Sequence, residues 1–479
     1  MTWFIKMKVS GIDIESHVEK IKQQIEADTT LSPSMRTTLD LLLLIVTLLC
    51  QRLGLNSSNS SKPPSTDLNR KKEPKNSSEN NSGGQKGHKG STLLLDSNPD
   101  IKHKLSVDQT LLPEGTYTEI GYETRQVIDI EFKRVVTEYQ AQILENEIGK
   151  RFVASFPKEV NSRIQYGNGV KAHAVYLSQY QLLPYDRIRE YFTDQLNIPL
   201  SSGSLYNFIN TAYSKLEETH ALEIIKANLR NEAVLHADET GININGKRQW
   251  LHNASSLKWT YLSAHEKRGH TAMDDIGILS HFNGVMCHDH WKPYYRYDCL
   301  HSLCNAHHLR ELTRSYEQDG QAWAETMRLF LVSLNQSVNN EDGLISKDKQ
   351  SSYIAQYRTI LKDGEKESPA PIVVKGKRGR PKKSKSRNLL ERLQNYEGDV
   401  LRFMADREVP FTNNQGENDL RMAKVQQKIS GCFRSEYGAE MFFGLRSYLS
   451  SNKKQGVSAS TALALLLNGM LPNIFTPAE

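Results

Sequence analysis

Apolar residues recur along the chain with two different spacings, which divide it into helical and strand-forming segments. Between residues 14 and 54 they recur every three or four positions, as at Leu39, Leu42, Leu43, Val46 and Leu49. This spacing predicts a helix. The segment, which we assign to residues 1–55, is either a coiled-coil or dimerisation helix or a helix packed on its own chain.

Apolar and polar residues alternate further along the chain. The runs QVIDIEF (126–132) and RVVTEYQAQIL (134–144) both alternate, which predicts strands with one buried face. We therefore expect a small β module over residues 101–160.

Helical spacing returns over residues 168–230. The run LPYDRIREYFTDQL is followed by the short break NIPLS and then by SGSLYNFINTAYSKL. Two helices joined by a short turn are compatible with a helix-turn-helix DNA-binding region within residues 161–230. Two packed helices without a DNA role are the commoner explanation of such a pattern.

Short strands are predicted again from residue 232. EAVLHAD (232–238) and GVMCHDH (284–290) are short apolar runs that end in a carboxylate, and 249–264 predicts two strands around a turn at 253–256. Residues from about 296 to 404 and from 437 to 470 have helical patterns. We expect a mixed α/β core over 231–435 with a helical insertion, and a helical C-terminal segment over 436–479.

Positive charge is concentrated in one segment. The formal net charge is +6, but residues 375–387 (KGKRGRPKKSKSR) carry eight positive charges and no negative one, so the rest of the chain sums to −2. Concentrated positive charge beside a near-neutral body indicates a polyanion partner, by default nucleic acid. The alternative is a solvated loop. Residues 56–100 contain a polar, weakly basic linker that cannot fold alone.

Cysteine content and hydropathy indicate a cytosolic protein. The five cysteines are sparse and unevenly spaced, which argues against a disulfide framework. The most apolar run, residues 41–50, has ten residues, whereas a membrane helix needs about 20. The first residues lack the layout of a signal peptide. We therefore expect no membrane segment.

Two carboxylates follow predicted strands. Asp238 and Asp289 each end one of the short apolar runs, and strand ends in α/β sheets are where ligands and catalytic groups collect. Strand alternation places His236 on the face of Asp238, with Glu239 pointing away, so Glu239 is expected to be structural. It also places His288 and His290 opposite Asp289, which argues against a single site made of these three residues.

A third candidate carboxylate is Glu417, at the start of a predicted helix in NNQGENDLRMAKVQQKIS. Steps of four, seven and eleven residues reach Arg421, Lys424 and Lys428, near one face of the helix. Three carboxylates from different elements are a minimal ligand set for Mg²⁺, and the cations suit DNA phosphates. The alternative is a surface helix with an ordinary Glu417–Arg421 pair.

A second set of metal-binding residue types lies in CLHSLCNAHHL. It contains Cys299, Cys304, His307 and His308. Their spacing matches no paired-ligand zinc pattern, so we interpret them as buried packing residues and expect no structural zinc.

Several motifs occur together in a familiar order. HADETG, CHDHWKPY, LCNAHHLREL and NNQGENDLR, with NSSNSSKPPS and GGQKGHKG in the linker and KRGRPKKSK in the basic loop, resemble transposases of the insertion sequence sixty-six type. The resemblance runs from about residue 30 to the C-terminus. It implies an RNase H-like α/β core, a mixed sheet flanked by helices, with the catalytic, metal-binding triad on Asp238, Asp289 and Glu417.

The resemblance also implies an activity, cofactors and partners. The enzyme would use Mg²⁺ or Mn²⁺ to cleave DNA at the ends of an insertion sequence and transfer the strands into target DNA. It would act in the bacterial cytoplasm, associated with the nucleoid, as a homo-oligomer, with accessory proteins of the same element as further candidates. In the AT-hook-like loop, DNA-contacting residues would be Arg378, Arg380, Lys382 and Lys383.

One departure from the family keeps an alternative open. Members usually carry paired CxxC motifs for zinc after the linker, but residues 103–156 contain no cysteine, so a thiolate zinc site cannot form there. The chain could therefore be a DNA-binding accessory protein or a catalytically decayed transposase. A third reading is a nuclease or resolvase that cleaves without strand joining.

Overall fold

The computed structural model describes residues 8–9, 12–53, 55–60, 67, 93–371 and 382–476. Most of the predicted linker lies outside these residues, as do Arg378 and Arg380 of the basic loop. No helix within the described ranges is long and apolar enough to cross a membrane.

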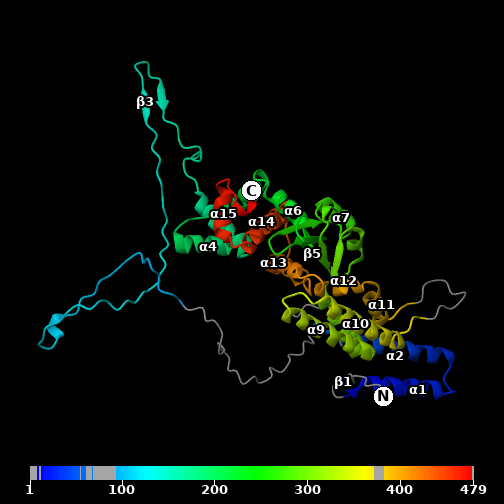
Figure 1. The fold of residues 1–479 in the computed structure, drawn as a ribbon. Helices are drawn as coiled ribbons and strands as arrows, with labels where there is room; N and C mark the ends of the chain where they lie inside the picture. Colours follow the sequence, from blue (N-terminus) through cyan, green and yellow to red (C-terminus); the bar gives the residue numbers. More distant parts are fainter. Residues whose placement is uncertain are drawn as a thin grey trace.

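The N-terminal segment is a pair of helices, not one helix (Figure 1). After the short strands β1 (Lys8–Val9) and β2 (Ile12–Asp13), helix α1 spans Ile14–Ala27 and α2 spans Pro33–Leu53. The break arises because the Ser32 hydroxyl accepts the Met35 backbone N–H at 3.2 Å, and a proline follows Ser32 as the first helical residue.

Residues 93–167 form an extended arm rather than a compact β module (Figure 1). Its strands are β3 (Ile143–Glu145) and β4 (Arg151–Val153), an antiparallel pair. The strand prediction for 126–132 is wrong, and for 134–144 it holds only at the last two residues. An alternating pattern forms a stable strand only where another layer covers its apolar face, whereas Val127 on the arm is 93% exposed.

Helices before and after the sheet in sequence form one apolar core. The helical prediction for 168–230 is confirmed by α3 (Asn168–Val175), a π turn (Tyr176–Tyr180), α4 (Tyr185–Leu196), α5 (Ser202–Glu218) and α6 (Ala221–Arg230). They pack with the C-terminal helices α14 (Glu436–Lys454) and α15 (Ala459–Leu467). In α5, the buried residues Leu205, Phe208, Ile209 and Ala212 recur at helical spacing and face this core.

A five-stranded mixed sheet lies at the centre, in the order β7-β6-β5-β8-β9. Strands β5 (Val234–Ile244), β6 (Lys247–Ser255) and β7 (Thr260–His265) are antiparallel, while β8 (Val285–His288) and β9 (Leu300–Leu303) run parallel to β5. Two strands form over 249–264 as predicted, but the turn between them lies at 256–259 and not at 253–256, because Asn253 to Ser255 pair within the sheet as part of β6. Helix α14 covers the β7 edge, where two of its serine hydroxyls accept strand N–H groups.

A helical insertion follows β9 in sequence and has its own apolar core, as predicted for 296–404. It comprises α8 (Asn305–Asp319), α9 (Ala322–Asn340), α10 (Lys347–Glu367), α11 (Lys385–Asn395) and α12 (Glu397–Leu401). Trp323, Leu331, Tyr357 and Leu390 are almost fully buried within it. On the opposite face of the sheet, α7 (His270–Ile276) packs against the apolar core that α3–α6 form with α14 and α15.

Helix α13 (Asn414–Ser430) is held on the sheet through Asn413, the residue before its first turn. The Asn413 amide nitrogen donates to the Ala237 carbonyl at 2.9 Å, and its amide oxygen lies 2.7 Å from Nδ1 of His236. Its backbone N–H donates to the Cys304 sulfur at 3.1 Å. With only 2% of its surface exposed, Asn413 joins α13 to β5 and to the residue that precedes α8.

We predict that Asn413→Ala lowers the free energy of unfolding by about 2–4 kcal/mol, because it leaves the buried His236 N–H and the Ala237 carbonyl without partners. Denaturant unfolding measures the change.

Ser458→Ala is a matched control, since it removes a helix cap from α15 at a cost of about 1 kcal/mol. Equal effects of the two substitutions would contradict the role assigned to Asn413.

Candidate metal-binding active site

The pairing of β5 with β8 brings Asp238 and Asp289 to the same level of the sheet. His236 is paired with Cys287 in the parallel register, so the residues two positions further on are Asp238 and Asp289. Paired residues in a parallel sheet point to the same face. Asp238 therefore leaves the sheet on the same side as His236, and Asp289 lies just beyond the last paired residues, close enough to act on the charge of Asp238.

Asp289 follows the last residue of β8, as predicted, but Asp238 lies inside β5 and not at its end. The short apolar run 232–238 underestimates this strand because β5 continues to pair with β6 as far as Ile244. Only the parallel pairing with β8 stops before Asp238. The carboxylates thus lie where the two strands separate, the usual place for ligands in such sheets.

Glu417 reaches the same place from the first turn of α13. Burial raises the pKa of Asp238 well above its ordinary range, and the nearby carboxylates of Glu239, Asp289 and Glu417 raise it further. Asp289 and Glu417 are therefore near enough to Asp238 to act on its charge, but among the described residues the three acids do not form a group whose possible ligand atoms all lie within 4.8 Å of one another.

Glu239 belongs to a different environment. Its carboxylate accepts hydrogen bonds from Arg268 at 2.6 and 2.9 Å and from the hydroxyl of the buried Tyr294. Its side chain is only 2% exposed, and burial raises its pKa. This arrangement is that of a neutralised structural carboxylate, in line with the expectation from strand alternation.

Asp419 is likewise neutralised, which distinguishes it from Glu417 on the same helix. Lys454 of α14 lies 2.8 Å from the Asp419 carboxylate. Glu417 instead has the His307 ring at 4.0 Å. Among the ion pairs of the described residues, none joins Glu417 to Arg421, so the alternative of an ordinary surface pair does not describe this helix.

The predicted DNA-contacting cations differ in their surroundings. Arg421 and Lys428 are exposed on α13, but Lys424 is partly buried and donates to the Gly241 carbonyl of β5. Burial lowers the pKa of Lys424. In the basic loop, Lys382 is exposed, while Lys383 pairs with Glu391 of α11.

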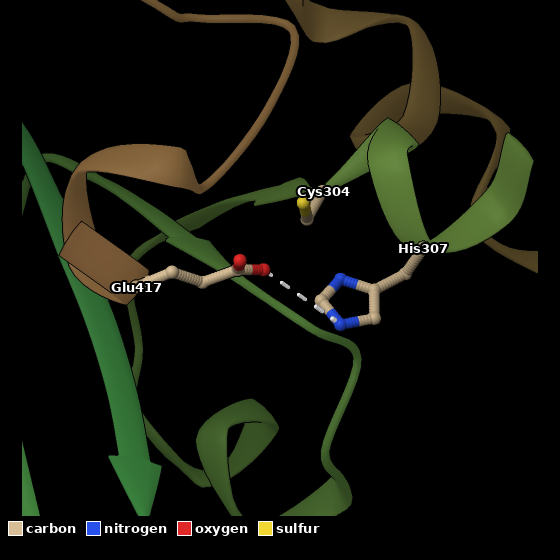
Figure 2. A group of neighbouring side chains, drawn as sticks. All are labelled: Cys304, His307 and Glu417. Carbon is tan, nitrogen blue, oxygen red and sulfur yellow. Dashed lines mark ion pairs between the residues drawn. The ribbon is translucent and has the colours of Figure 1, made fainter. Parts of the chain in front are cut away.

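Cys304 and His307 are further residues of the site. Figure 2 shows their side chains and that of Glu417 directed toward one another; the possible ligand atoms of the three all lie within 4.8 Å of each other. Of the four candidate residues in CLHSLCNAHHL, only Cys304 and His307 therefore belong to this group. His308 is buried with its Nδ1 atom 3.1 Å from the Asn305 amide oxygen, and Cys299 packs against the first apolar core.

The signal for this pair was present in the sequence. Cys304 immediately precedes α8 and His307 lies in its first turn, so a spacing of three residues puts both on one side of the helix start. Their convergence with Glu417 depends on the docking of α13, which local spacing does not reveal.

We predict that Asp238→Asn stabilises the metal-free protein at neutral pH by an amount on the order of 1 kcal/mol. The pKa of Asp238 is higher in the folded protein than its value of about 3.9 in an unfolded chain. Protonation therefore favours folding, and the stability of the wild type falls as the pH rises from near 3.9 toward the raised pKa. Thermal unfolding in chelator at several pH values measures this.

The exposed Asp348 provides a control, because Asp348→Asn should show no such pH-dependent gain. Added Mg²⁺ should stabilise the wild type more than Asp238→Asn. Equal stability of Asp238→Asn and wild type across this pH range would contradict the buried, unneutralised charge.

Comparison with known families assigns the chain to a family. Residues 163–441 match the family model described as "Transposase IS66 family", which covers the helices α3–α6, the sheet, the insertion and α13. Residues 13–93 match a family of unknown function, DUF6444. No curated protein matches the chain significantly. Because the first match spans more than half of the 479 residues, the chain belongs to the IS66 family of transposases.

Proposed function

We propose that this transposase cleaves DNA at the ends of an insertion sequence and joins the freed strands to target DNA through a metal-dependent triad of Asp238, Asp289 and Glu417. The observation that supports this most directly is that the pKa of Asp238 is raised by burial and by nearby carboxylates, among them Asp289, which follows β8, and Glu417 of α13. Perturbed groups of this kind cluster at functional sites.

The three residues fit Mg²⁺ or Mn²⁺. Carboxylate oxygens are the hard ligands these ions prefer, and a cation would offset the burial and the neighbouring negative charge that together raise the pKa of Asp238. When bound, a pair of such ions activates the attacking oxygen and stabilises the leaving one in phosphoryl transfer. The chain itself orients the acids: the sheet holds Asp238 and Asp289, and Asn413 fixes the start of the helix that carries Glu417.

The sheet supports an RNase H-like assignment of the core. Three antiparallel strands continue into two strands parallel to the first; Asp238 lies on the first strand in sequence order and Asp289 directly follows the fourth. The helical insertion then separates Asp289 from Glu417 by 127 residues.

DNA is the partner of this family, and exposed cations suggest how the chain holds it. Arg421 and Lys428 lie beyond Glu417 on α13 and are exposed, where they would contact the phosphate backbone. The basic loop, with Arg378, Arg380, Lys382 and Lys383, would add affinity that weakens as salt increases. Lys424 would contribute only after leaving the Gly241 carbonyl.

We predict that Asp289→Asn abolishes strand cleavage and joining while leaving DNA binding intact. The expected loss in rate exceeds about 100-fold, since even changes behind a metal ligand cost about 10–100-fold. The assay uses purified protein, labelled element-end DNA and Mg²⁺, with candidate accessory proteins of the element added in parallel. Asp348→Asn is the matched control on the surface of the insertion.

The outcomes separate the alternatives. If wild type binds the ends but does not react with any addition, the chain is a binding protein or a decayed transposase. Cleavage without joining indicates a nuclease or resolvase. Activity retained by Asp289→Asn would remove this residue from the triad.

We also propose that the protein acts as a homo-oligomer through α2. Leu42 and Leu49 are 53% and 55% exposed, and a separation of seven residues places them on one face, as in a coiled coil. Several neighbouring aliphatic side chains of α2 are similarly exposed, namely Leu41, Leu44, Ile45 and Leu48. Exposed apolar patches of this kind mark interaction sites.

We predict that the double substitution Leu42→Asp and Leu49→Asp reduces the oligomer to a smaller species, because charges cannot be buried in an apolar helical interface. Light scattering after size-exclusion chromatography measures the mass. Thr37→Asp adds a charge at an exposed polar position of the same helix and should have no effect. An unchanged mass of the leucine variant would place the interface elsewhere.

A further inference from the structure

The starts of two helices, α8 and α13, bring a sulfur, a nitrogen and an oxygen ligand together, and the oxygen ligand is Glu417 of the proposed triad. Cys304 immediately precedes α8, His307 lies in the first turn of α8, and Glu417 lies in the first turn of α13. Their candidate ligand atoms lie within 4.8 Å of one another, and Nε2 of His307 is 4.0 Å from Glu417 (Figure 2). This set is chemically different from the all-carboxylate triad.

Such a donor set selects a soft or borderline cation. Thiolate and imidazole ligands favour Zn²⁺, whereas Mg²⁺ requires oxygen ligands. Three protein ligands with an open fourth position are typical of an accessible zinc site. With metal–ligand distances of about 2.0–2.3 Å, tetrahedral ligands are about 3.5 Å apart, so the three side chains need to close by roughly 1 Å.

The state of His307 supports ligand binding over simple packing. Within the described residues, its buried Nδ1 atom has no hydrogen-bond partner, although buried polar groups are normally satisfied. Its side chain is 24% exposed and that of Glu417 is 32% exposed, so a cation can approach from solvent. Cys304 is buried behind them.

The thiol of Cys304 is already oriented. Its sulfur accepts the backbone N–H of Asn413 at 3.1 Å, and a thiolate would accept this bond more strongly. On zinc binding the thiol proton passes to solvent, and the sulfur retains the Asn413 bond while bound to the metal. The ligand set therefore does not require α13 to leave the sheet.

We infer that Cys304, His307 and Glu417 form a Zn²⁺ site that competes with the catalytic site for Glu417, so that zinc inhibits the transposase reversibly. A carboxylate directed toward Cys304 and His307 is withdrawn from Asp238 and Asp289, and Mg²⁺ then loses one of its three protein ligands. The metal-binding part stands on this geometry alone. The inhibitory part rests on the function proposed above.

The binding test uses Co²⁺ as a spectroscopic probe in the full-length protein. The wild type should show a cobalt–thiolate charge-transfer band that Zn²⁺ removes. Cys304→Ser should abolish the band and raise the Kd for Zn²⁺ in calorimetry by at least about 100-fold, since loss of a ligand exceeds the roughly 10–100-fold cost of changes behind one. His307→Gln should weaken binding and alter the band.

Matched variants make the assignment specific. Cys299→Ser and Cys432→Ser remove thiols outside the cluster and should leave the band unchanged. Asp289→Asn alters the triad without touching the sulfur site and should also retain it, whereas Glu417→Gln should change it. A wild type without the band, or a band that survives in Cys304→Ser with the variant folded by circular dichroism, overturns the site.

The inhibition is tested separately. Zn²⁺ should slow cleavage by the wild type in Mg²⁺, with recovery when a chelator or excess Mg²⁺ is added. Zinc that binds at Cys304 without slowing cleavage overturns the sharing of Glu417. If no cleavage occurs even without zinc, the proposed function fails, while the response of the cobalt band to Glu417→Gln still decides whether this carboxylate is a ligand of the site.

Discussion

The candidate site depends on the buried contact that Asn413 makes between α13 and β5. One side chain satisfies the Ala237 carbonyl and the His236 ring, and its backbone N–H meets Cys304. Each such bond contributes only about 1 kcal/mol net, but leaving its partner unsatisfied inside the protein costs more. These hydrogen bonds therefore hold α13 in one position on the sheet. They do so mainly because breaking them leaves buried groups unpaired, and less because each bond adds to the free energy of folding.

Gly416, in the first turn of α13, leaves room for the side chain of Asn413. A Cβ atom at Gly416 would lie 3.1 Å from the Asn413 amide, closer than a relaxed contact, so a side chain there would press on the anchor. The Gly416 carbonyl also accepts a hydrogen bond from Asn253 of β6 at 3.1 Å. Glu417 is the next residue, so its backbone position is set by two strands at once.

Selective neutralisation of acids defines what this anchored site can do. Arg268 and Tyr294 satisfy Glu239, and Lys454 pairs with Asp419, while burial, together with the nearby carboxylates of Glu239, Asp289 and Glu417, raises the pKa of Asp238. Much of this arrangement of acids could be predicted from the sequence. Strand alternation placed Glu239 on the face opposite Asp238, and the end of a predicted strand identified Asp289 as a candidate. The length of β5 could not be predicted, because its second half is specified by pairing with β6. The anchoring role of Asn413 was not predicted, because its partners are distant in sequence.

In the arm and the N-terminal helices, the sequence pattern predicts buried residues that the structure leaves exposed. Alternation at 126–132 and leucine spacing in α2 are both signals of burial, yet Val127 and Leu42 remain largely exposed in one chain. Among the described residues no layer covers these apolar positions, and the assembly proposed above would supply one from another molecule. If that molecule is a second copy, assembly would complete the apolar surfaces and bring two carboxylate sites into one complex. Binding of paired DNA ends and burial of these surfaces would then favour each other.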